Sequence, residues 1–224
     1  NHVARKQISL DIMGGDGTPF KVQDTLIKPR SSCATTISSI LAAEKVAPAL
    51  KNIKDVKQVT VEVYEFAKER MATGEHHWNP DSRETADHSI PYVTAAALMH
   101  GTVTPRQFND AHLWNPELRA LIQKVEVVTN DEFTKVYERH SLLPVVHLTR
   151  VTVMTHSGER FVGESGGDKG DLSENKSDAQ IEEKFRSLTE DFLGAKRVNA
   201  ILDRLWHLDD LENVAVVPPA FVLG

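Results

Sequence analysis

Strand-like and helix-like patterns alternate along the chain up to about residue 165, and only helical patterns follow. In the clearest strand, residues 56–64, Val59, Val61 and Val63 would point to one side and polar residues to the other. Further strands are predicted at 20–27, 125–128, 148–154 and 160–163, the last two as a hairpin turning at Ser157 and Gly158. This order favours an α+β unit followed by a helical segment.

Two stretches of the first part carry apolar residues at helical spacing. We expect one helix at 34–46 and a longer helix from about Ser82 to Met99, with Gly101 as a left-handed cap. Residues 164–175 are polar and glycine-rich, which indicates a boundary. Beyond it Ser177 offers a capping signal for the first of two terminal helices. Their apolar stripes need a partner surface, which sequence upstream of this chain would supply.

Composition excludes several classes of protein. A net charge of -6 argues against a nucleic-acid binder, although a local cationic pocket for a small anion remains compatible with it. No apolar stretch approaches roughly 18 residues, so no membrane span is predicted. The ten histidines lack the spacing of a helical zinc motif, and we expect no metal and no cofactor. The chain begins without Met or a signal peptide, so we expect missing upstream sequence and leave the compartment open between cytoplasm and mitochondrial matrix.

The helix expected at 82–99 carries the first candidate site. His88 and Tyr92 are four residues apart and would share one side of that helix, with Arg83 and Asp87 a turn earlier and Ser89 beside them. Such a group at a helix start could hold a carboxylate and move a proton. The simpler alternative is a capped helix with a buried, hydrogen-bonded tyrosine, and spacing alone favours that alternative.

The turn after residue 27 carries the second candidate site. Lys28 and Arg30 could neutralise a polycarboxylate, the arginine through two parallel bonds and the lysine as a point charge. A solvated loop is the alternative, and it is favoured on sequence alone. Cys33 follows at the start of the next helix, where a small packed residue is favoured over a nucleophile because no paired base is evident.

The stretch from Asn79 to Tyr92, which contains Arg83 and the run Asp87, His88 and Ser89, resembles a motif of the MmgE/PrpD family. Other segments resemble the family in the same order: Gly101, Val103 to Pro105, Phe108, Pro116 to Arg119, Lys124 to Val127, Arg150 to Val153, Ser177 with Asp178, and Glu183 to Arg186. The similarity runs from about Phe20 to Leu211.

The resemblance implies an architecture in which an all-helical domain is paired with a smaller α+β lid, and the chain then returns to the helical domain. On this basis residues 1–19 are a connector from a helical domain largely missing from this chain, 20–165 are the lid, and 166–224 are the returning helices. The family implies a site between the two domains, no iron–sulfur cluster, and a homodimer.

The resemblance also implies site residues. Lys28 resembles the lysine in the turn after the first lid strand, His88 the histidine of the family motif, and Tyr92 the tyrosine of the lid helix. We expect these three to be catalytic and Arg83, Ser89, Arg30 and Cys33 to bind substrate. Some relatives carry histidine where this chain has Cys33, and the family's usual Gly-His-Pro after the hairpin is absent.

The predicted function is a lyase that dehydrates a hydroxy-tricarboxylate such as 2-methylcitrate, with this chain supplying the lid half of the site. A base would take the proton α to a carboxylate while an acid protonates the departing hydroxyl. The alternatives are a cis-aconitate-type decarboxylase or an epimerase of the same family, or a non-catalytic fragment with a structural role. We expect this chain alone to be inactive.

Overall fold

The computed structural model describes residues 13–15, 17–139, 146–170 and 172–222. It forms two compact units, residues 1–174 and 175–224. The first unit is α+β, as predicted. Its elements in chain order are α1 (Ala34–Val46), β1 (Val56–Val63), α2 (Glu65–Met71), α3 (Glu75–Trp78), α4 (Arg83–Asp87), α5 (Ile90–His100), α6 (Asp110–Leu113), α7 (Pro116–Ile122), β2 (Val125–Thr129), α8 (Asp131–Arg139), β3 (Thr149–Thr155) and β4 (Arg160–Ser165).

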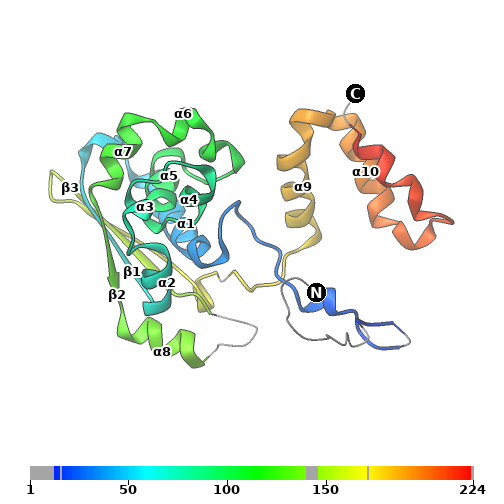
Figure 1. Ribbon diagram of the computed structural model, residues 1–224, viewed down its shortest axis with the longest axis horizontal. Coiled ribbons are helices and arrows are strands. Elements are labelled where there is room, and N and C mark those ends of the chain that lie inside the picture. The colour runs from blue at the N-terminus through cyan, green and yellow to red at the C-terminus, as the bar shows by residue number, and fades with distance from the viewer. Residues whose placement is uncertain (1–12, 16, 140–145, 171, 223–224) are drawn as a thin grey trace, which may run out of the picture. The chain divides into compact units, whose positions relative to one another are not determined.

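A four-stranded mixed sheet in the order β2-β1-β3-β4 forms the frame of this unit. The central strand β1 pairs in parallel with β2 and antiparallel with β3, and β3 pairs antiparallel with β4. Val59, Val61 and Val63 point into the core, as the alternation predicted. Helices α1 and α5 lie on one side of the strands (Figure 1), and α1 packs on β3 and β4.

Close packing between α1 and the edge strand β4 depends on a glycine. A Cβ built at Gly163 would lie 2.1 Å from the carbonyl oxygen of Ala42 and 2.9 Å from Cγ2 of Val46. Any larger residue would therefore push α1 away from the sheet.

The predicted strand at 20–27 is wrong. A short 3-10 helix (Lys21–Asp24) occupies this segment instead, and Thr25 closes it by donating its backbone N–H to Val22 O at 3.1 Å. Phe20, Val22 and Ile27 are exposed. A strand needs a neighbouring strand for its ladder of hydrogen bonds, and none of the described strands pairs with this segment. Residues 1–12 of the predicted connector lie outside the described residues.

The single helix predicted from about Ser82 to Met99 is also wrong. It is two helices, α4 and α5, with His88 and Ser89 between them. Pro91 explains the break, because in a continuous helix it would lack its own N–H donor and its ring would collide with the carbonyl of residue 87, four residues earlier. Ser89 starts α5 by accepting from Tyr92 N at 3.0 Å, and Gly101 ends it at φ 79° as predicted.

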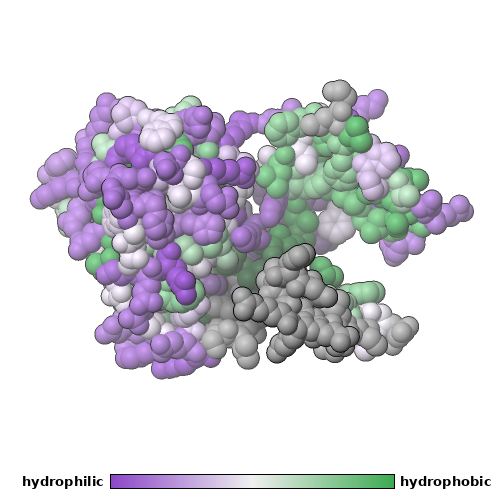
Figure 2. All heavy atoms as spheres, viewed as in Figure 1, coloured by the Kyte–Doolittle hydropathy of each residue, from purple (hydrophilic) through white to green (hydrophobic). Residues whose placement is uncertain are grey.

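The second unit contains α9 (Asp178–Leu193) and α10 (Ala195–Trp206), the two predicted terminal helices. Ser177 and Gln180 form the predicted capping box of α9. The helices contact each other, and Arg186 of α9 donates to Asn199 Oδ1 of α10 at 2.6 Å. Apolar residues are common on this unit (Figure 2), and Phe192 is 73% exposed. The glycine-rich segment before it belongs to the first unit, where Ser165 Oγ donates to Gly170 O at 2.9 Å.

Candidate functional site

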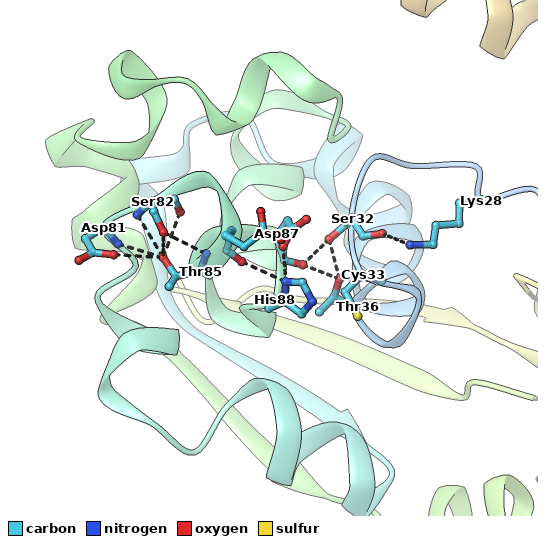
Figure 3. A network of polar contacts seen from close by, with 10 residues as sticks. Lys28, Ser32, Cys33, Thr36, Asp81, Ser82, Thr85, Asp87 and His88 are labelled. Atoms are coloured by element: carbon cyan, nitrogen blue, oxygen red, sulfur yellow. Dashed lines mark hydrogen bonds and ion pairs between the residues drawn. The ribbon is translucent and has the colours of Figure 1, made fainter. Parts of the chain in front are cut away.

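The break between α4 and α5 and the turn before α1 meet at the backbone carbonyl of Asp87 (Figure 3). Ser32 Oγ donates to this oxygen at 2.7 Å and Cys33 N donates to it at 3.2 Å. Pro91 prevents the carbonyl from accepting the usual helical bond, so its lone pairs are open to these donors, and Thr36 Oγ1 also lies 3.3 Å from it. Two segments 55 residues apart in the sequence are thereby joined at one atom.

Thr36 supports this junction from the first turn of α1. Its Oγ1 lies 2.6 Å from Ser32 Oγ and donates to Cys33 O at 2.9 Å. Ser32 and Thr36 are both buried, which favours short, well-satisfied polar contacts over contacts with water. Neither residue was predicted to be part of the site from the sequence, and only their place beside Lys28 and Cys33 hinted at them.

Lys28 and His88 lie on either side of the junction. The ammonium of Lys28 donates to Ser32 O at 3.1 Å. His88 ends α4, and its Nδ1 contacts Asp87 Oδ1 and also lies 3.0 Å from Glu84 O. The imidazole is 44% exposed. The ammonium of Lys28, the backbone of Cys33 and a half-exposed imidazole are therefore linked through one hydrogen-bonded network.

Tyr92 does not share a side with His88, contrary to the expectation from a continuous helix. Its side chain is fully buried, its hydroxyl donates to Gln107 O, and its ring stacks on Phe108 with centroids 5.9 Å apart. Burial raises the pKa of Tyr92 to about 12, against a smaller lowering by the nearby Arg119. In this conformation its hydroxyl serves the packing of the core.

The residues expected to bind substrate fall into two groups. Ser89 is buried and its Oγ donates to His77 O while it caps α5, so both of its hydrogen-bonding roles are taken within the protein. Arg30 forms two parallel bonds with Glu44 of α1, at 2.5 and 2.7 Å, and a third to Pro29 O. Arg83, in contrast, is exposed in the first turn of α4. Cys33 is partly exposed as the residue that caps α1.

Neither a metal centre nor a membrane-spanning helix is found among the described residues. No group of three or more His, Cys, Asp or Glu side chains there is arranged to hold a metal ion. Within the same ranges, no helix combines the length and apolar character needed to cross a bilayer.

His77 is a second histidine close to this region, because its carbonyl accepts from Ser89 Oγ. It is buried in α3, its Nδ1 accepts from Gly74 N at 3.1 Å, and its ring lies 3.9 Å from that of His76. Burial lowers the pKa of His77, and the neighbouring His76 and the more weakly coupled His88 lower it further, against an opposing backbone hydrogen bond. His77 is therefore a neutral structural residue at pH 7.

Comparison with known proteins agrees with the resemblance of the sequence. The profile of the MmgE/PrpD C-terminal domain matches residues 31–208, beginning just after Lys28 and Arg30. Over 138 residues, or 62% of this chain, the sequence is 26% identical to human cis-aconitate decarboxylase and 24% identical to the mouse enzyme of that name. The chain spans 27% of the length of each of these relatives. Because the profile covers most of the sequence, this chain belongs to the MmgE/PrpD family of lyases and carries its C-terminal domain.

Proposed function

We propose that this chain contributes Lys28 and His88 to a lyase that dehydrates a hydroxy-tricarboxylate such as 2-methylcitrate. The observation that supports this most is the network through Asp87, because it links an ammonium and a half-exposed imidazole through hydrogen bonds. Family membership supports the reaction class.

Each residue then has a defined chemical task. The ammonium of Lys28 lies close to a substrate carboxylate and balances the negative charge that builds up when a proton leaves the α carbon. The C–H electron pair becomes the new double bond, and the C–O bond breaks as an acid protonates the departing hydroxyl. His88 takes or supplies one of these protons, and Arg83 binds a second carboxylate. Groups outside this chain supply the remaining acid–base chemistry.

Decarboxylation of cis-aconitate is the second candidate. Its support is that the two mammalian relatives carry that name. In that reaction the C–C bond to the carboxylate breaks, CO2 leaves, and the electron pair is protonated by one acid. Lys28 and His88 suit this task as well, since it also needs charge neutralisation and one proton donor.

The test uses the polypeptide encoded by the whole reading frame that contains this chain. Formation of the unsaturated acid from 2-methylcitrate or citrate supports dehydration, whereas CO2 release from cis-aconitate supports the second candidate. Lys28→Ala and His88→Gln should each lower kcat/KM by at least about 100-fold, as expected when a charge-stabilising or proton-transfer group is removed. Arg106→Ala, which removes an exposed cation elsewhere in the same unit, is the matched control.

Turnover by the whole polypeptide but not by residues 1–224 alone would agree with a site completed by an upstream helical domain. We propose that this chain has two partners, the upstream helical domain and a second copy of the chain. Unchanged turnover in both Lys28→Ala and His88→Gln would refute the proposed roles, and absence of turnover with all three acids would favour a structural role for the chain.

A further inference from the structure

Asp87 contacts both parts of the candidate site, His88 on one side and the turn that carries Lys28 and Cys33 on the other. Its carboxylate contacts Nδ1 of His88, and its carbonyl accepts from Ser32 Oγ and Cys33 N (Figure 3). The contact of Asp87 with His88 could not be predicted from the sequence, because adjacent residues carry no periodic signal of contact.

The contacts of the imidazole determine which nitrogen carries its hydrogen. Nδ1 faces two oxygens, Asp87 Oδ1 and Glu84 O, and both are acceptors. Nδ1 must therefore be the N–H donor, and in the neutral ring Nε2 then bears the lone pair. No hydrogen bond to Nε2 is found among the described residues, and the ring is 44% exposed. The nitrogen left for proton exchange is thus Nε2.

The carbonyl of the same residue determines where the cation lies. Since Ser32 and Cys33 are held at this oxygen, the position of Ser32 O, to which Lys28 donates at 3.1 Å, is fixed relative to α4. A shift of the backbone at residue 87 would therefore move the imidazole and the ammonium together. The side chain of Asp87 is 25% exposed, so a water molecule is a realistic competitor for its contact with His88.

We propose that Asp87 is a positioning residue of the active site: its carboxylate holds His88 in the Nδ1–H form and so assigns proton transfer to Nε2. The catalytic part of this inference rests on the proposed function, whereas the tautomer does not. The same logic applies wherever a carboxylate orients a catalytic imidazole.

The first experiment measures the tautomer without any turnover. Proton–nitrogen correlation spectra of the full chain, labelled with 15N-histidine, are recorded at pH about 9, where ordinary imidazoles are neutral. His88→Gln identifies the signals of this ring among the ten histidines. We expect the Nδ1–H pattern in the unmodified chain and a shift towards Nε2–H in Asp87→Asn, whose amide can turn its NH2 towards Nδ1.

Glu84→Gln is the matched control, because it removes one negative charge from the same helix and keeps the backbone oxygen that contacts Nδ1. It should leave the Nδ1–H pattern unchanged. An Nε2–H pattern in the unmodified chain would overturn the proposal. So would an Nδ1–H pattern that Asp87→Asn leaves unchanged. Asp87→Glu, which keeps a carboxylate, should retain more of the Nδ1–H form than Asp87→Asn does.

The second experiment measures kinetics in the whole polypeptide. Asp87→Asn should lower kcat by about 10- to 100-fold, the range known for partners that orient a functional imidazole, with a much smaller change in KM. Unchanged kcat in an active enzyme would refute the positioning role while leaving the lyase proposal standing. An inactive enzyme whose His88 still shows the Asp87-dependent tautomer would refute the lyase proposal and leave the tautomer assignment standing.

Discussion

Replacing Tyr92 with Phe distinguishes a packed tyrosine from an exposed catalytic one. The hydroxyl is buried and donates to Gln107 O, so the variant loses one hydrogen bond and leaves a carbonyl without its partner. Such losses cost about 1–2 kcal/mol. In a unit of this size each kcal/mol corresponds to a shift of roughly 2–4 °C in Tm, so we expect a fall of about 2–8 °C.

The stability that Tyr92 contributes should depend on pH in a way that is specific to a buried phenol. The pKa of Tyr92 is raised to about 12, while an unfolded tyrosine ionises near pH 10, so between these values the folded state binds more protons. The contribution of the phenol to stability is therefore present below pH 10 and is lost as pH rises towards 12. Over that window the loss amounts to about 2–3 kcal/mol.

The assay is urea unfolding of the unmodified chain and of Tyr92→Phe at a series of pH values. Their difference in free energy of unfolding should favour the unmodified chain at pH 8, shrink above pH 10 and change sign as the pH approaches 12. Tyr137→Phe is the control, because that ring is partly exposed and its stacking on Tyr64, at 4.1 Å between centroids, survives the change. Equal stability of Tyr92→Phe and the unmodified chain at pH 8, together with lost turnover, would refute the reasoning and restore Tyr92 as a proton donor.

Two further predictions concern the same unit. Gly163→Ala should lower stability by about 1–3 kcal/mol, because the new Cβ would meet Ala42 O at 2.1 Å; thermal unfolding measures this, and an unchanged Tm would show that α1 can move aside. The pKa of His77 is lowered from the ordinary value of 6.5, so between the folded value and pH 6.5 the unfolded state binds more protons than the folded state. The contribution of neutral His77 to stability is therefore fully present above pH 6.5 and is lost as the pH falls through the folded value. Urea unfolding at pH 5 and pH 7.5 should show a smaller acid loss in His77→Asn than in the unmodified chain, and equal losses would contradict this origin.

The elements that could be predicted from the sequence are those whose signals are local. The alternation of Val59, Val61 and Val63 has the period of a strand, and Gly101 and Ser177 terminate helices through their own backbone or side-chain chemistry. These predictions were confirmed. The prediction of a strand at 20–27 was wrong because its apolar residues have no partner strand among the described residues, and no local pattern can reveal that.

The candidate site could be predicted in part. Lys28 and His88 match family motifs, Cys33 was named for its place at the start of a helix, and hydrogen bonds through Asp87 join these three residues. Treating 82–99 as one helix placed Tyr92 beside His88, although Pro91 already indicated a break. α8 was not predicted either, although Asn130 caps it by accepting from Glu132 N at 3.0 Å and Phe133 N at 3.2 Å.

The order of strands in the sheet also bears on how the chain acquires its shape. The central strand β1 finds its two neighbours, β2 and β3, only after some seventy and ninety further residues have been made, as the pairs Val59 with Val125 and Val59 with Val153 show. The hairpin of β3 and β4 closes locally and needs no such wait. We therefore expect pulse-labelled hydrogen exchange to protect the hairpin before β1, which leaves this inner strand unpaired while the intervening residues are made.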